Sequence, residues 1–199
     1  IQLAGPLTDG MFNADPRSST RSRNYYEPDI HVPSLSLDWQ PNTRTRVHWT
    51  TSAVLGVRSS VLFDRPADVL DAIDSTTLQY AARQVDIDHY QSITSELRVL
   101  HTYTLAGRSS TFTAGAQYMN NDLHRRQLGK GTTGTDFDLT LTQSGWGRDL
   151  HYLTGNIALF TENRCTLTRK FSLTVGARLE SGTTDMGGHI TYYADQDVP

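Results

Sequence analysis

The residues best suited to bind a ligand are arginines and glutamines that lie between the segments predicted to be strands. Guanidinium groups bind anions through charge-assisted, often bidentate hydrogen bonds. Several such stretches that meet at one rim of a protein can therefore hold a small anion. The residues that we expect to contact such a ligand are Arg58, Arg83, Gln84, Arg125, Arg126 and Gln127. A further group, Arg17, Arg21 and Arg23, lies beside Tyr25 and Tyr26.

An alternative remains open for each of these arginines. A guanidinium group can pair with a nearby carboxylate, or bind lipid phosphates, without contacting a specific ligand. The aspartates available in the same stretches are Asp64, Asp68, Asp86, Asp136 and Asp138.

Other kinds of chemistry find little support. The seven histidines are scattered, without the H-x-x-x-H spacing of a helical metal site, and Cys165 is the only cysteine. No G-x-S-x-G motif marks a hydrolase nucleophile. The glycine-rich stretch 129–134 lacks the residue order of a phosphate-binding loop, so we interpret it as a flexible loop tip. We expect no catalytic residue, no metal site and no cofactor, and a protein that is not an enzyme.

Composition and charge restrict the class of protein. The chain is 37% hydrophobic and 20% charged, with a formal net charge of −3. An excess of acidic residues gives no reason to expect a nucleic-acid partner. The mean hydropathy of −0.47 and the lack of an apolar run of about 18 residues exclude a transmembrane helix. A membrane barrel is not excluded, because its strands face lipid only at every second residue.

Six segments alternate apolar and polar residues with the period of two that is typical of β-strands. In 171–180, for example, Phe171, Leu173 and Val175 alternate with Ser172 and Thr174. The other predicted strands are 31–40, 46–56, 90–103, 111–118 and 152–162. The same alternation places Glu96 with Arg98, and Arg178 with Glu180, on a polar face, which is typical of opposite charges that line a wet lumen.

The lengths of the connections indicate the architecture. The short turns are 40–46, 103–111 and 163–170, and the long connections are 5–29, 57–89, 120–151 and the segment from 181 onward. Short and long connections therefore alternate, as they do in outer-membrane barrels, which have short periplasmic turns and long extracellular loops. Within the second long connection, 67–80 has the spacing of a short helix. A soluble β-sandwich is the alternative fold.

These patterns predict an all-β chain that forms part of an antiparallel transmembrane β-barrel. Aromatic residues lie near several strand ends, where membrane interfaces place them. Six strands are too few to enclose an aqueous lumen. We therefore expect residues 1–199 to be the middle portion of a larger barrel.

Two adjacent segments carry a resemblance to a known family. Residues 156–163 end in Phe-Thr-Glu-Asn, and 167–180 end in Gly-Ala-Arg-Leu-Glu. This pair resembles a hairpin of TonB-dependent outer-membrane receptors. The stretches 58–61, 83–88 and 121–139 resemble the subgroup related to ferric citrate receptors.

The resemblance implies a 22-stranded barrel plugged by an N-terminal domain. It also implies TonB-energised uptake of a ferric chelate, such as ferric citrate or a similar anionic siderophore. The plug, the signal peptide and the remaining strands then lie outside residues 1–199, and the TonB complex acts through that N-terminal part. Outer-membrane lipid and lipopolysaccharide are the other expected partners. Another siderophore, a cobalamin or a glycan as cargo, and a secreted β-sandwich binding module, remain alternatives.

Overall fold

The described part of the chain folds into one antiparallel sheet and one short helix. The computed structural model describes residues 1–21, 23–134, 137–191 and 196–198. Within them the elements are α1 (Asp9–Ala14), β1 (Tyr25–His31), β2 (Ser34–Asn42), β3 (Thr45–Leu62), β4 (Gln84–Leu105), β5 (Arg108–Lys130), β6 (Arg148–Thr166), β7 (Ser172–Ile190) and β8 (Gln196–Val198). The expected all-β class is confirmed.

Neighbours in the sheet are mostly neighbours in the chain. The strand order is β1-β3-β4-β5-β6-β7-β8, and β2 pairs with the same edge of β3 as β1 does. Every pairing is antiparallel. The described strands all join one sheet, so this part of the chain does not form the two packed sheets of a sandwich.

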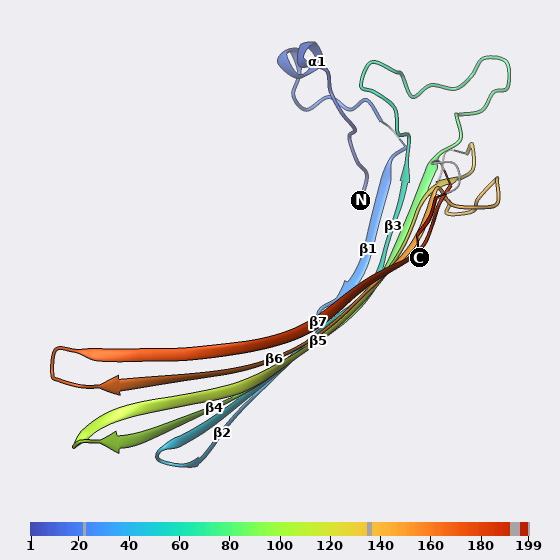
Figure 1. Cartoon of the computed structure of the whole chain (residues 1–199). Helices are drawn as coiled ribbons and strands as arrows, with labels where there is room; N and C mark the ends of the chain where they lie inside the picture. Colours follow the sequence, from blue (N-terminus) through green and yellow to red (C-terminus); the bar gives the residue numbers. More distant parts are fainter. Residues whose placement is uncertain (22, 135–136, 192–195, 199) are drawn as a thin grey trace.

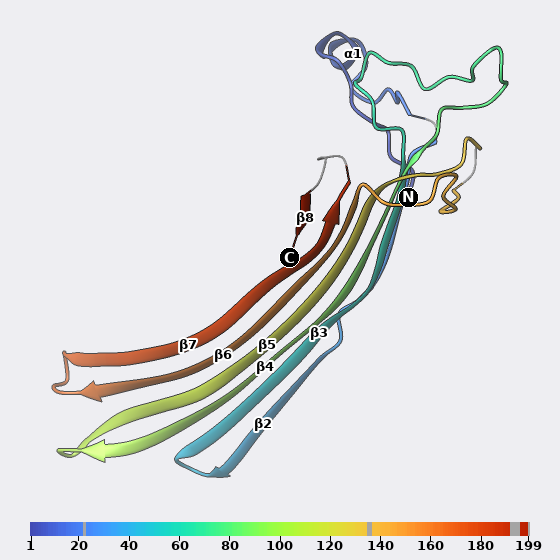
Figure 2. The same ribbon diagram turned by 45° about the vertical axis from the view of Figure 1, so that its right-hand side comes forward.

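The two ends of the sheet differ in their connections. Figures 1 and 2 show β3 to β7 bending together partway along their length. The turns β2–β3, β4–β5 and β6–β7 lie at one end, which we call the hairpin end. Helix α1 and the connection between β3 and β4 lie beyond the other, which we call the loop end (Figure 1). The expected separation of short and long connections is confirmed.

Side chains alternate between two chemically different faces, because successive residues of a strand point to opposite sides. One cross-strand row contains Leu37, Trp49, Leu97, Ala116, Leu159 and Leu179. The neighbouring row on the opposite side contains Ser36, Thr50, Glu96, Gln117, Ala158 and Glu180. We call these sides the apolar face and the polar face.

The strands are longer than the sequence pattern predicts. Strand β5 continues to Lys130 and β6 begins at Arg148, whereas 120–151 was expected to be one connection. Strands β3, β4 and β7 also extend further toward the loop end, to lengths of 18, 22 and 19 residues. In the extensions of β5 and β7 polar residues occupy both faces, so the period of two disappears while the hydrogen-bonded ladder continues. In the extension of β4 the alternation persists, because Val85 and Ile87 alternate with Gln84, Asp86 and Asp88.

The predicted strand 31–40 corresponds to β2, and only its first residue, His31, belongs to the preceding strand β1. The break between β1 and β2 falls at Val32 and Pro33. Strand β1 pairs with residues 55–61 of β3, and β2 pairs with residues 45–52. One long strand therefore has two successive partners along the same edge.

The predicted helix over 67–80 is wrong. The Asp74 carboxylate instead accepts backbone hydrogen bonds from Thr76 and Thr77, both at 2.8 Å, and Leu78 has a positive φ of 56°. These contacts form a local turn, which is the usual alternative to helix for aspartate. The helix that does form, α1, begins after Thr8, whose hydroxyl accepts the N–H of Met11 at 3.3 Å.

The turn between β4 and β5 gives a test of the fold. Ala106 and Gly107 have φ of 51° and 74°, as a type I′ two-residue turn requires. Nothing lies within 4 Å of a Cβ built on Gly107, so a substitution there meets only backbone strain. We predict that Gly107→Val lowers the free energy of unfolding in urea by about 1–2 kcal/mol. Gly107→Asn should cost less, because asparagine tolerates positive φ. Equal stability of the two variants would contradict this turn geometry.

Candidate functional site

Two of the predicted ligand-binding arginines meet on the polar face, toward its loop end. Arg58 of β3, Asp88 of β4 and Arg125 of β5 are direct cross-strand neighbours. We call these three residues the Asp88 row. The Asp88 side chain is fully buried, while the side chains of Arg58 and Arg125 remain 31% and 30% exposed. The two arginines thus lie in strands rather than in loops, which corrects the expectation.

The Asp88 carboxylate holds both guanidinium groups. It accepts a hydrogen bond from Arg58 Nη2, and it accepts Arg125 Nε at 3.3 Å and Nη2 at 3.4 Å. The Arg58 guanidinium also lies 6.0 Å from the centre of the Tyr90 ring. One carboxylate between two guanidinium groups gives these three residues a net charge of +1, which the nearby Asp86 carboxylate opposes through its interaction with Arg58. The row can therefore attract an anion, with its arginines already oriented.

Arg83 and Gln84 do not join this row. Arg83 precedes β4 and is 2% exposed, and its Nη1 pairs with the equally buried Asp71 at 2.7 Å. Gln84 donates its amide N–H groups to both Asp86 oxygens, at 3.0 and 2.9 Å. The pairing of these arginines with aspartates, left open from the sequence, thus occurs at Arg58, Arg83 and Arg125, although neither Asp71 nor Asp88 was among the aspartates considered.

Arg126 and Gln127 also separate from Arg125. Consecutive strand residues point to opposite faces, so Arg126 lies on the side of the apolar face. Its guanidinium lies 5.4 Å from the centre of a Trp146 ring. Gln127 returns to the side of Arg125 and lies opposite Arg148 in the register. Arg125, Arg126 and Gln127 were therefore expected to act together because they are adjacent in sequence, but the strand places them on two opposite faces.

Arg21, from the N-terminal group of arginines, has a structural role at the loop end. It is fully buried, and its guanidinium donates to the backbone oxygens of Phe63, Thr20, Val69, Arg65 and Pro66 at 2.7–3.2 Å. The guanidinium carbons of Arg21 and Arg83 lie 4.8 and 5.3 Å from the centre of the same Phe63 ring. Arg21 thereby ties the N-terminal segment to the connection after β3.

Charged pairs continue along the polar face toward the hairpin end. Glu96 and Arg98 form an ion pair at 2.7 Å, and Arg178 and Glu180 form another at 2.9 Å. Arg178 Nη2 also donates to the Gln117 side chain at 2.9 Å. The expected common face for these charges is confirmed.

Sequence reasoning missed a row of histidines. His89, His124 and His151 are cross-strand neighbours on β4, β5 and β6. The rings of His124 and His151 stack with centres 3.8 Å apart, and His124 Nε2 lies 2.7 Å from an Asp149 oxygen. Within the described residues, no three potential ligand groups are arranged to hold a metal ion. The sequence could have predicted that His89 and His124 are paired. The two residues are equally far along the chain from the β4–β5 turn, and such residues face each other in a hairpin.

Comparisons with known proteins give no relative. No protein-family model, curated protein or solved structure matches the chain. Among the residues that the structure describes, no helix is long and apolar enough to cross a membrane.

The burial of Asp88 makes the Asp88 row sensitive to loss of charge. We predict that Asp88→Asn lowers the free energy of unfolding by about 3 kcal/mol or more, because it leaves two close guanidinium groups without a counter-charge. Glu96→Gln is the matched control. It breaks a more exposed ion pair and should cost less than about 1 kcal/mol. Urea unfolding followed by tryptophan fluorescence measures both. Similar losses in the two variants would contradict the special role of Asp88.

Proposed function

We propose that this chain forms part of the wall of a bacterial outer-membrane β-barrel, and that the barrel is a TonB-dependent receptor for an anionic ferric chelate such as ferric citrate. The membrane assignment depends mainly on one observation, the exposure of the apolar face. The proposal of transport is supported by the charge of the Asp88 row and by the resemblance of 156–180 to receptor hairpins.

The apolar face supports contact with lipid. Leu37, Ile157, Leu159 and Leu179 are 55%, 57%, 54% and 73% exposed, and they lie on one side of a sheet whose other side carries ion pairs. A continuous exposed apolar surface of this kind marks an interaction surface or a membrane contact. Apolar residues outward and polar residues inward are the arrangement of a membrane barrel wall.

The strand lengths support the same assignment. About 9–11 tilted residues cross a bilayer, whereas β4 and β5 have 22 and 23 residues. The remaining half of each strand projects beyond the bilayer on the side of the long loops. The Asp88 row belongs to this projecting half, where a ligand arriving from outside the cell meets it first.

The edges of the sheet support a larger wall. Strand β7 pairs with β8 only at Gly188–Ile190, so most of its outer edge has no partner strand within the described residues. Unpaired backbone groups are costly in hydrocarbon. Further strands of the same barrel satisfy them in this proposal.

The apolar face gives the first test. We predict that Leu97→Arg, near the middle of the apolar face, destabilises the lipid-embedded protein by about 2–4 kcal/mol, because it places a charge in hydrocarbon. Thr94→Arg, three residues away on the polar face, is the matched control and should cost much less. Urea unfolding from lipid vesicles measures both effects. If both arginines are tolerated equally, or if the protein is found outside the outer-membrane fraction of cells, the membrane assignment fails.

The Asp88 row gives the second test. We predict that Arg125→Ala in the full-length protein weakens binding of ferric citrate about tenfold or more, because it removes a charge-assisted contact. Arg126→Ala, which lies on the opposite side of β5, should leave the affinity unchanged. Calorimetric titration in detergent, with iron-free citrate for comparison, measures both.

The outcomes separate two parts of the proposal. Absence of heat with ferric citrate in a folded, membrane-inserted protein would remove the cargo and retain the wall. Unchanged affinity in Arg125→Ala would remove the Asp88 row as the binding site.

A further inference from the structure

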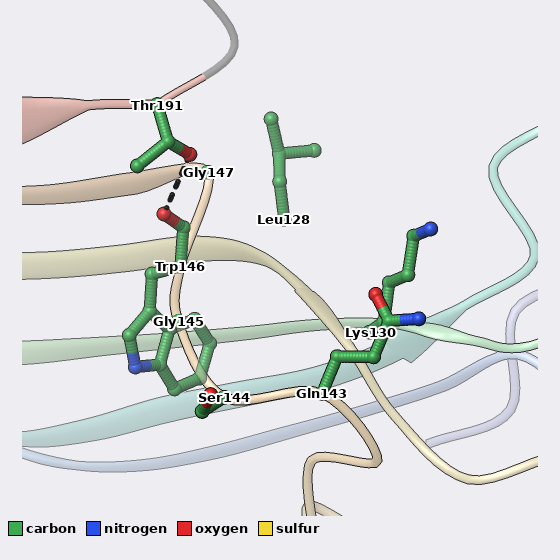
Figure 3. A pocket seen from close by; sticks show the side chains of 8 residues that line it. All are labelled: Leu128, Lys130, Gln143, Ser144, Gly145, Trp146, Gly147 and Thr191. Carbon is green, nitrogen blue, oxygen red and sulfur yellow. Dashed lines mark hydrogen bonds between the residues drawn. The ribbon is translucent and has the colours of Figure 1, made fainter.

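A cavity of about 470 Å³ lies at the loop end, between the end of β5 and the segment that leads into β6. Its lining includes Leu128, Lys130, Gln143, Ser144, Trp146 and Thr191. Figure 3 shows the Trp146 ring on one side, with Lys130 and Gln143 on the other. Its volume falls within the range of about 300–1,000 Å³ that is usual for small-molecule sites.

The Trp146 ring is held in place from several sides. The Arg126 guanidinium lies 5.4 Å from a ring centre. A Cβ on Gly129 would come within 2.9 Å of Cζ3, so the ring packs closely over bare backbone. The backbone of Trp146 is held as well, because the hydroxyl of Thr191, which follows β7, donates to the Trp146 carbonyl oxygen at 3.0 Å. A rigid aromatic surface binds with little loss of conformational entropy.

Three polar side chains of the lining are available to a ligand, while the Thr191 hydroxyl is bound to the Trp146 carbonyl oxygen. The Lys130 ammonium, the Gln143 amide and the Ser144 hydroxyl form no hydrogen bond or ion pair with the part of the chain that the structure describes. Gly145 has nothing within 4 Å of the position of a Cβ, so the backbone beside the ring is open. The cavity thus combines one flat aromatic wall with donors and an acceptor.

We propose that this cavity binds a pyranose sugar, with a preference for one that carries an acidic group. A pyranose has a flat face of C–H groups, which packs on an aromatic ring, and a rim of hydroxyls that pair with amide and hydroxyl groups. The Lys130 ammonium supplies the partner for a carboxylate or phosphate substituent. Trp146 packs against Arg126 on the side opposite Arg125, so the site is separate from the Asp88 row and does not depend on the proposed cargo.

Ligand-observed NMR titration of the full-length protein tests the site with methyl glucoside and glucuronate. We expect saturable binding of both sugars, tighter for glucuronate, with the strongest saturation transfer to the ring C–H protons. Trp146→Leu keeps an apolar side chain but removes the aromatic face, and should weaken binding about tenfold or more. Trp39→Leu, which removes an exposed tryptophan of β2, is the matched control and should have no effect.

Two further variants keep the test decisive if Trp146→Leu fails to fold. Gln143→Ala should weaken both sugars about threefold to tenfold through a lost hydrogen bond. Lys130→Met should abolish the preference for glucuronate. Absence of saturable sugar binding, or unchanged affinity in these variants, overturns the proposal.

Two larger ligands distinguish whether the sugar belongs to a membrane lipid or to a free glycan. Binding of de-acylated lipopolysaccharide core identifies the glycan of a membrane lipid, and binding of a soluble glucuronate oligosaccharide identifies a free glycan. Either result supports a sugar site, and failure of all sugars refutes it.

Discussion

The whole structure depends on one constraint, the alternation of side chains along a nearly continuous antiparallel ladder. The ladder places each side chain on one face of the sheet, so residues adjacent in sequence lie on opposite faces and contact different groups. Leu159 is exposed on the apolar face, whereas Ala158 is fully buried on the polar face. Arg125 meets a carboxylate, whereas Arg126 meets an indole ring. The chemistry of each surface is thus set by register rather than by closeness in sequence.

Toward the loop end, buried charges lie beside most of the buried apolar side chains, such as Val61, Phe63 and Val85. Asp88 and Arg21 are fully buried, and each is surrounded by groups of opposite polarity, guanidinium groups in one case and carbonyl oxygens in the other. Buried charges of this kind contribute little net stability, but removing one partner is costly. They favour one arrangement of the strands and loops over its competitors, because a shifted register would leave a charge unpaired.

Sequence periodicity predicted the all-β class, the positions of most long strands and their two faces, because Leu97 or Leu159 alternates with polar neighbours. It could not predict where the strands end, since residues such as Asn121 and Asp122 are polar on both faces. For the same reason Arg125 was expected in a loop, and Arg58 was expected in one because the predicted strand ended at Gly56. Their meeting at Asp88, and the stacking of His124 on His151, required a cross-strand register that no local pattern contains.

The two-residue turn at Ala106 and Gly107 also bears on how the chain assembles. Its strands are adjacent in the chain, so closing this turn costs little loop entropy, and pairing can then proceed residue by residue from Leu105 and Arg108. Pairing of β5 with β6 must wait for closure of the much longer segment between them. The β2–β3 and β6–β7 turns are also short, so the three hairpins are the natural first units, and the β3–β4 and β5–β6 pairings then join them.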